Sequence, residues 1–328
     1  MAARLEAAPR AGTPEVVPLR QLRAAHLEPL LEEEVHAWRE ALDWDFSKSA
    51  DLVRRFVDMH ALQGFALLEA GQVIGYSYYV LEDRKGLIGD LYVRLGRHSP
   101  ALELRLLRSV VGAIMQSACV RRIESQLMMA RWHAAHVLPA VPSLTVYERN
   151  FMRLDFGENP PPGPPRRAPR PAVFLERWND QYQESAAQLI AEAYEGHVDS
   201  LINDQYRSLA GARRFLFNIV QYPGCGIFFR PASLAAFDAQ TGRMCGICLT
   251  SIVAEGCGHI TQICVAPRVR AGGVGYALLQ QSLASLHACG CRKISLTVTA
   301  SNQEAVSLYE SVGFRTVRKF SALVWEGF

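Results

Sequence analysis

A short run of glycines after an apolar segment is the part of the sequence best suited to bind a phosphate group. Residues 260–265 form a segment of strand type, and Pro267 ends it because proline cannot donate a hydrogen bond to a sheet. Arg270-Ala271-Gly272-Gly273-Val274-Gly275 follows, and leucines at helical spacing come next. The first turn of a helix has unpaired N–H groups, its dipole favours negative charge, and glycine allows close backbone approach. The pattern therefore predicts an anion site, to which Arg270 adds a positive fork.

The spacing of this loop does not fit the two commonest nucleotide-binding patterns, the P-loop and the dinucleotide fingerprint. Arg270-x-x-Gly273-x-Gly275 after a strand instead resembles the acyl-CoA pyrophosphate loop of the GNAT superfamily of N-acetyltransferases. Residues 302–314 resemble the family's next signature, because Asn302, Ala305, Tyr309 and Gly313-Phe314 stand at its spacing on a short helix and turn. Specific motifs cover only residues 259–314.

The resemblance implies direct transfer of an acetyl group from acetyl-CoA to an amine, without a metal. In this family the pantetheine arm lies where a parallel sheet splays, and a backbone N–H, here that of Val265, stabilises the oxyanion. Tyr309 matches the tyrosine that acts as general acid toward the departing thiolate. Asn302 matches a position that contacts the cofactor. The implied cofactor-binding residues are Ile263, Cys264, Val265, Arg270, Ala271, Gly272, Gly273, Val274, Gly275, Tyr276 and Asn302.

The general base has two candidates in the sequence. His259 precedes the glycine loop on the same strand and resembles one strand histidine of arylalkylamine N-acetyltransferases, although Thr261 replaces their second histidine. It is equally well explained as a structural histidine. Glu255 is the rival, and it is equally well explained as a solvated turn residue. Glu195, His197 and Asp199 lie in a segment that shapes the acceptor pocket in the family, so they are candidates for holding the amine.

Length and composition are those of a globular protein with about two domains. The chain has 328 residues, 49% hydrophobic and 20% charged, with a net charge of +3 that is too small to indicate nucleic acid as the main partner. No apolar run is long enough for a membrane span, and the first residues lack the apolar core of a secretory signal. We therefore expect a cytoplasmic protein without a membrane or nucleic-acid partner.

The eight cysteines include Cys245-x-x-Cys248, a spacing found in metal and redox sites. Both residues lie in an apolar run, 244–253, that is typical of a strand. Residues three apart on a strand face opposite sides of the sheet, so this pair cannot hold one ion together. Buried, reduced thiols are the favoured interpretation, and metal binding is the alternative.

Two tandem GNAT-like domains of mixed α/β class, each a twisted mixed sheet flanked by helices, are the predicted fold. The predicted divisions are a flexible leader (1–14), a degenerate GNAT-like domain (15–156), a proline-rich linker (157–171) and a GNAT domain with the acyl-CoA site (172–328). The predicted strands are 15–19, 65–69, 73–81, 87–93, 123–128, 173–178, 234–237, 244–253, 259–265, 293–299 and 316–325, and the predicted helices start near 22, 50, 101, 182, 210, 274 and 301.

The first half has lost the phosphate loop in this interpretation. When Val93 is aligned with Val265, Ala101 replaces Gly273 and Glu103 puts a carboxylate in place of Gly275. Residues 147–151 echo the Tyr309 helix but lack its glycine. Because two such domains can form a pseudo-dimer, a monomer and a homodimer are both expected.

Three functions fit the sequence. The first is an acetyl-CoA-dependent N-acetyltransferase acting on a primary amine, carried by a small molecule or a peptide. The second is a non-catalytic acyl-CoA-binding or regulatory module, and Tyr309 favours the first because a pure binder needs no acid for a leaving group. The third is a redox or metal protein that uses the cysteines.

Overall fold

A computed structural model describes residues 13–132, 143–158, 161–165, 167–222 and 224–328. Most of the predicted leader therefore lies outside the described residues. The chain forms two compact units. The first contains the described residues of 1–37, 50–144 and 325–328, and the second contains 38–49 and 145–324. These divisions differ from the predicted domain boundaries, because the second unit includes two segments of the N-terminal half.

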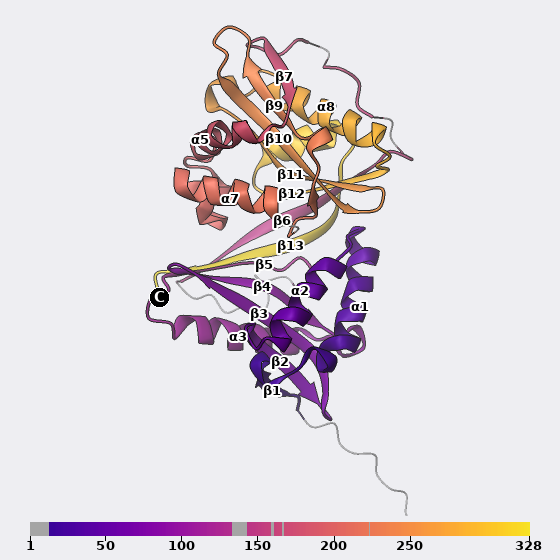
Figure 1. Cartoon of the computed structure of the whole chain (residues 1–328), viewed down its shortest axis with the longest axis vertical. Coiled ribbons are helices and arrows are strands. Elements are labelled where there is room, and N and C mark those ends of the chain that lie inside the picture. Colours follow the sequence, from indigo (N-terminus) through magenta and orange to yellow (C-terminus); the bar gives the residue numbers. More distant parts are fainter. Residues whose placement is uncertain (1–12, 133–142, 159–160, 166, 223) are drawn as a thin grey trace, which may run out of the picture. The chain divides into compact units, whose positions relative to one another are not determined.

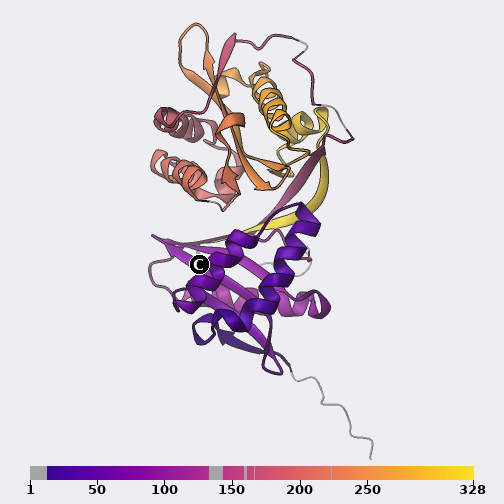
Figure 2. The same ribbon diagram turned by 45° about the vertical axis from the view of Figure 1, so that its right-hand side comes forward.

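The first unit is a sheet with helices on both faces (Figures 1 and 2). Helices α1 and α2 cover one face and α3 covers the other. The strands follow the order β1 (Glu15–Pro18), β2 (Gln63–Glu69), β3 (Gln72–Glu82), β4 (Lys85–Val93) and β5 (Arg122–Gln126), and only the β4–β5 pair is parallel. The helices are α1 (Ala24–Leu42), α2 (Ser47–Asp58) and α3 (Pro100–Met115). The predicted second helix begins earlier than expected, since Asp45 Oδ1 accepts from the Ser47 N–H at 3.0 Å.

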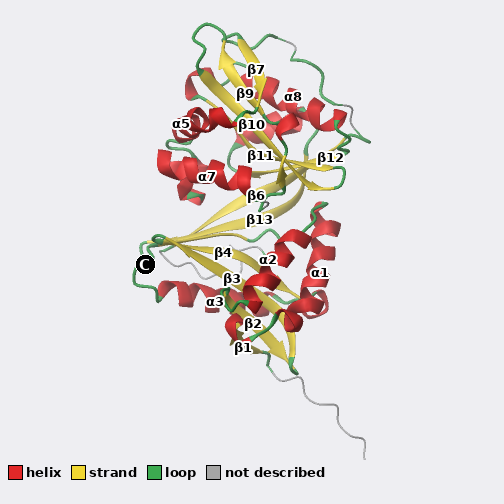
Figure 3. Cartoon of the chain, viewed as in Figure 1, coloured by secondary structure: helices red, strands yellow, loops and turns green. Residues whose placement is uncertain are grey.

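The second unit is a larger mixed sheet between helices α5 and α7 on one side and α8 on the other (Figure 3). Its strand order is β13 (Arg315–Glu326), β6 (Leu144–Asp155), β12 (Lys293–Thr299), β11 (Cys257–Val265), β10 (Met244–Ala254), β9 (Leu234–Asp238) and β7 (Val173–Arg177), with β8 (Ile227–Phe228) beside β10. The helices are α5 (Gln183–Ala193), α6 (Val198–Ile202), α7 (Leu209–Gln221), α8 (Val274–Ala288) and α9 (Gln303–Ser311). A mixed sheet flanked by helices, as predicted, is confirmed.

Residues 147–151, which echo the Tyr309 motif in sequence, do not form a helix like that of Tyr309. They lie in β6, which pairs antiparallel with β12 from Arg149–Thr299 to Asp155–Lys293. Strands β6 and β13 have twelve residues each, and each is the last strand of its half of the sequence. The repeat therefore aligns β6 with β13, and the last strand of the N-terminal half is built into the second unit.

Both halves contain the same splayed parallel pair of strands. Strand β4 pairs with β5 over Lys85–Ile88, and β11 pairs with β12 over Cys257–Ile260. In each half the first of these strands then continues without its parallel neighbour. A register shift lies at the same place in both halves. The pairing of β4 with β3 shifts around Gly89, and the pairing of β11 with β10 shifts around Thr261. The N-terminal half thus keeps the splayed sheet of its counterpart.

The loop after the splay differs between the halves. Helix α3 has its N-cap at Ser99, six residues after Val93, whereas α8 has its N-cap at Gly273, eight residues after Val265. The predicted alignment of Glu103 with Gly275 is therefore two residues off. Glu103 is nevertheless buried near the start of α3, with Oε1 3.2 Å from His98 Nε2. A carboxylate in that first turn opposes the binding of an anion.

A buried carboxyl pair lies beside the splay of the first unit. Glu34 of α1 and Asp90 of β4 share a side-chain hydrogen bond, and the Tyr76 hydroxyl donates to Glu34 Oε2 at 2.8 Å. Two carboxyl groups in hydrogen-bond contact must hold a proton between them. Burial raises the pKa of Asp90 above its ordinary value.

We expect this pair to make the protein less stable as the pH rises. A carboxyl whose pKa is raised in the folded state binds its proton more tightly there, so its stabilisation is complete at low pH and is lost as the pH passes the raised pKa. In urea unfolding between pH 4 and 8, Asp90→Asn should flatten this dependence and become more stable than wild type toward pH 8. Asp51→Asn, at an exposed position, is the control. Parallel curves for wild type and Asp90→Asn would contradict the prediction.

The described part of the proline-rich linker lies along α8 and its preceding loop. Tyr276 Oη donates to the Gly163 carbonyl at 3.1 Å, and Gln280 Nε2 donates to the Pro162 carbonyl at 3.3 Å. The Arg170 N–H donates to the Gly272 carbonyl at 2.8 Å. The linker is therefore in part a packed segment and not only a solvated spacer. Among the described residues, none of the helices has the length and apolarity that crossing a membrane requires.

Candidate active site

The glycine loop before α8 offers a cradle for an anion. The first backbone bond of the helix is from the Ala277 N–H to the Gly273 carbonyl at 3.0 Å. The N–H groups of Val274, Gly275 and Tyr276 precede it and have no partner within the helix. Gly273 has φ of 84°, in the left-handed region that favours glycine, and no side chain caps the helix. The loop therefore presents donors and the positive end of a dipole, as predicted from its sequence.

Two glycines of the loop differ in what a side chain would meet there. A Cβ on Gly275 would meet nothing closer than Leu308 Cδ2 at 3.8 Å and Val265 Cγ1 at 3.9 Å. These are ordinary van der Waals distances, so packing alone does not require glycine at this position. Its missing side chain keeps the N–H groups of the first turn accessible to an anion. A Cβ on Gly272 would instead lie 1.9 Å from the Arg170 carbonyl oxygen. Gly272 is thus required by the linker that packs on the loop.

Arg270 does not direct its guanidinium at the cradle. Its Nη2 donates at 2.5 Å to the carbonyl of Ala193, the last residue of α5. Arg268 also turns to α5, with Nη1 3.1 Å from Glu192 Oε1. In this arrangement the Arg270 guanidinium is bound to α5, and its role toward pyrophosphate stays a prediction. The arginine holds the loop against α5, and the backbone N–H groups remain the donors for an anion.

The gap between β11 and β12 opens beyond Ile260 and Leu296, the last residues of their parallel pairing. The Ala266 N–H bonds to the Cys245 carbonyl, and Val265 lies opposite Gly246 in the antiparallel pair with β10. Hydrogen-bonded and open pairs alternate along such a ladder. The backbone groups of Val265 and Ile263 therefore face away from β10 and into the gap, while those of Cys264 bond to β10. Of the three predicted cofactor contacts on β11, two have their backbone available.

Tyr309 of α9 is buried, with 7% of its surface exposed, and its ring contacts Phe314 edge to face at 6.0 Å. Burial raises the pKa of the Tyr309 phenol well above its usual range, with smaller contributions from Cys248 and Asp199. The phenol therefore stays protonated over the whole physiological range and can donate a hydrogen bond. These two neighbours, on β10 and α6, indicate that the hydroxyl lies close to the sheet.

Asn302 is the N-cap of α9, so this helix begins two residues after the predicted start near 301. The Asn302 Oδ1 accepts from the Ala305 N–H at 3.3 Å. Its Nδ2 lies 3.2 Å from Nε2 of His197, which is the N-cap of α6. This contact joins the helix expected to touch the cofactor to the segment expected to touch the acceptor.

Neither predicted base is placed where the chemistry needs one. His259 is buried between the rings of Trp44 at 5.0 Å and Phe151 at 6.5 Å, and its Nδ1 lies 2.9 Å from Ser295 Oγ. Burial lowers the pKa of His259 to about 3, so it is a very weak base at pH 7. Glu255 is exposed in the turn between β10 and β11, at the far end of β11 from Val265. At roughly 3.3 Å per residue, that separation is far beyond hydrogen-bond reach.

Asp199, a predicted acceptor contact, forms an ion pair that the sequence did not reveal. Arg149 Nη1 of β6 donates to Asp199 Oδ1 at 3.0 Å and to Thr299 Oγ1 at 2.9 Å. Glu195 has no such role in the structure, where it lies exposed at the end of α5. Arg149 was missed because its segment was compared with the Tyr309 helix. Extending the repeat to align residues 144–155 with the last strand would have placed Arg149 beside β12.

The cysteines are free thiols, and none lies in a disulfide among the described residues. Cys245 and Cys248 are both fully buried on β10. Burial raises the pKa of Cys248 and of Cys264 to about 12. Such thiols are protonated at neutral pH and are poor nucleophiles and metal ligands.

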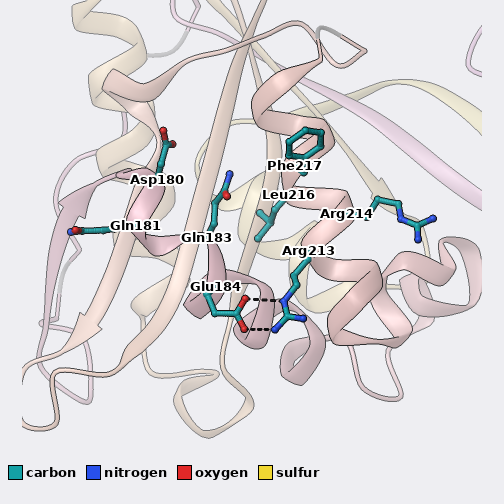
Figure 4. Close-up of a pocket in the computed structure, with 8 residues that line it drawn as sticks. All are labelled: Asp180, Gln181, Gln183, Glu184, Arg213, Arg214, Leu216 and Phe217. Atoms are coloured by element: carbon teal, nitrogen blue, oxygen red, sulfur yellow. Dashed lines mark hydrogen bonds and ion pairs between the residues drawn. The ribbon is translucent and has the colours of Figure 1, made fainter.

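A surface pocket of about 520 Å³ lies between the short helix η3 (Asp180–Tyr182), α5 and α7, away from these residues (Figure 4). Glu184 and Arg213 form a two-bond ion pair at its edge, and Phe217 lines it with about half of its surface exposed. None of the predicted site residues lines it.

Comparison with known proteins finds a family match within the second half of the chain. Residues 188–314 match the profile of the Acetyltransferase (GNAT) family. A segment of 90 residues is 37% identical to part of the mycothiol acetyltransferase of Streptomyces avermitilis. This segment makes up 27% of this chain and 29% of that protein. The matched segment is thus less than a third of that relative's length.

Two solved structures resemble nearly the whole chain. A GCN5-related N-acetyltransferase from Sphaerobacter thermophilus has a TM-score of 0.68 at 19% identity, over 95% of each chain. A tandem GNAT protein from the clavulanic acid biosynthesis pathway has a TM-score of 0.59 at 15% identity, over 95% of this chain and 98% of the other. At these identities the likeness is one of fold, and it extends to both halves of the chain.

Proposed function

We propose that this chain, which carries a GNAT acetyltransferase domain in its C-terminal half, transfers an acetyl group from acetyl-CoA to a primary amine. The observation that carries the proposal is the arrangement of three features in one unit. Strands β11 and β12 separate beyond Ile260, the anion cradle lies at the start of α8, which follows β11, and the protonated Tyr309 lies beside β10 and β11. The family match and the acetyltransferase among the relatives support the same chemistry.

The chain's own residues have separable roles in this reaction. Acetyl-CoA would supply an activated thioester, with its pyrophosphate at the N–H groups of Val274, Gly275 and Tyr276. The N–H of Val265 would stabilise the negative charge that develops on the carbonyl oxygen as the amine attacks. The carbon–nitrogen bond forms, the carbon–sulfur bond breaks, and Tyr309 donates a hydrogen bond or its proton to the departing sulfur. The ammonium loses its proton before attack, and water at the site can carry it away.

A covalent acyl-cysteine route is disfavoured by the thiols nearest to Tyr309. Cys264 and Cys248 both contribute to the pKa of the phenol, so they are close to it. Their own pKa values of about 12 keep them protonated, and only a thiolate attacks a thioester efficiently. Direct attack by the amine is therefore the favoured route.

A non-catalytic acyl-CoA-binding module remains the alternative, because the cradle and the gap would serve it equally well. The two functions differ in the fate of the bound acetyl-CoA. A binder would retain acetyl-CoA unchanged in the presence of any amine, whereas a transferase would release CoA thiol.

Calorimetry with acetyl-CoA tests the cofactor site directly. We expect one equivalent to bind to wild type, and Gly273→Glu to weaken binding about 100-fold or more, since it adds a negative charge and strains a left-handed residue. Gly242→Glu is a matched control, because Gly242 also has positive φ but lies in an open turn. Two equivalents would show that the first unit binds as well. No binding to wild type would refute the proposed function.

A further inference from the structure

The ion pair of Arg149 and Asp199 lies next to the place where the proposed reaction occurs. Both charges act on the pKa of the Tyr309 phenol, Asp199 raising it and Arg149 lowering it. Arg149 reaches this position from β6, and its other contacts, Thr297 and Thr299, are on the part of β12 beyond the splay. The pair therefore borders the gap on the side of α6.

Asp199 uses only one of its two oxygens. Oδ1 accepts from Arg149 Nη1 and from the Thr299 hydroxyl. Oδ2 has His197 Nδ1 as its neighbour at 3.9 Å, which is too long for a hydrogen bond. The carboxylate therefore keeps the acceptor capacity of one oxygen for a further donor.

Arg149 also has hydrogen-bonding capacity left for a further acceptor. Its Nη1 is fully engaged, and Nη2 has one bond of 3.2 Å to Thr297 Oγ1. Its Nε is buried without a hydrogen-bond partner, and Arg149 as a whole is 8% exposed. Nε and Nη2 form the side-on fork of a guanidinium, whose two parallel N–H groups match a carboxylate or carbonyl oxygen. A buried donor left open in this way calls for an explanation.

We propose that Arg149 and Asp199 form the acceptor subsite and select an α-aminoacyl group, a primary amine with a carbonyl or carboxylate on the adjacent carbon. The ammonium contacts Asp199 Oδ2, and the neighbouring oxygen accepts from Arg149 Nε and Nη2. This inference rests on the proposed function and adds the class of substrate. Free amino acids and the N-termini of peptides share this chemistry.

Charge balance argues against acceptors without the carbonyl. The Arg149–Asp199 pair is already neutral, so a bare alkylammonium would add an uncompensated positive charge next to a buried guanidinium. An α-carbonyl brings partial or full negative charge to the side of Arg149 and offsets it. The pair therefore complements a dipolar or zwitterionic group.

A panel of acceptors tests the inference with purified full-length protein and acetyl-CoA. L-alanine, a peptide with N-terminal alanine, and isopropylamine share the amine but differ in the neighbouring group. We expect kcat/KM for alanine or for the peptide to exceed that for isopropylamine by about 100-fold or more. Comparing L-alanine with the peptide distinguishes a free amino acid from a peptide N-terminus as the acceptor. Equal or better use of isopropylamine would overturn the inference while leaving the proposed function intact. Acetylation of no amine would overturn both.

Conservative variants test the two residues. Arg149→Lys keeps the charge but loses the fork, so the preference for the α-carbonyl should fall at least tenfold while acetyl-CoA affinity is unchanged. Asp199→Asn should raise the KM of the amine for the preferred acceptors. Arg153→Lys is the matched control, because Arg153 is on the same strand and pairs with Asp43 at 2.7 Å. Acetyl-CoA binding reports that each variant is folded. An unchanged preference in folded Arg149→Lys would refute the role of Arg149.

Discussion

Replacing Tyr309 by phenylalanine should lower kcat by about 10²–10³-fold and leave the KM for acetyl-CoA nearly unchanged. General acid catalysis contributes about 10²–10⁴-fold in enzymes, and the departing thiolate needs the donor only as its bond breaks. The ring is buried against Phe314 and the core, so phenylalanine keeps the packing. Steady-state release of CoA thiol with any accepted amine measures the effect.

Tyr182→Phe is a suitable control for the loss of a phenol. Tyr182 bonds to Glu176 near β7, outside the site, and its removal should leave kcat within twofold of wild type. If Tyr309→Phe retained the full kcat, Tyr309 would be a packing residue at the end of its helix. Absence of turnover in wild type with every amine tested would instead support the non-catalytic binding function.

The elements of the second unit were largely predictable because their signals are local. Strand β12 has the predicted bounds, and α8 starts within one residue of the glycine loop that predicted it. The glycine loop is identified by residue types whose physical roles do not depend on distant partners. The splay beyond Ile260 was implied by the family resemblance and is present in both halves.

The parts that could not be predicted depend on contacts between distant segments. The direction of the Arg270 side chain is set by the Ala193 carbonyl, which local sequence does not reveal. His259 has its low pKa because Trp44 and Phe151, both from the N-terminal half, cover it. Strand β12, which pairs with β6, is more than a hundred residues away in sequence. The sequence around Arg149 therefore did not reveal this pairing, and its likeness to the Tyr309 motif led to a different alignment.

The C-terminal half therefore should not fold without the first half. A chain starting at Gly157 lacks β6, which pairs along β12 and contributes the buried side chains of Met152 and Leu154 to the core. It also lacks Trp44 and the bond from the Asp45 N–H to the Val253 carbonyl. Deleting one large buried side chain costs about 2–5 kcal/mol, and a whole protein is stable by about 5–15 kcal/mol. The loss of several such groups together with a strand exceeds what a domain tolerates.

Expression of residues 157–328 alone should give a chain with no cooperative urea transition and no near-ultraviolet circular dichroism. A full-length protein cleaved at a protease site inserted after Glu158 is the control, because it has the same break in the backbone but retains β6. We expect the cleaved protein to unfold cooperatively and to bind acetyl-CoA like the intact chain. Cooperative unfolding of the isolated fragment, with unchanged acetyl-CoA affinity, would show that β6 and the Trp44 segment are dispensable. The first half would then have to be retained for another reason than completing the sheet and supplying Arg149.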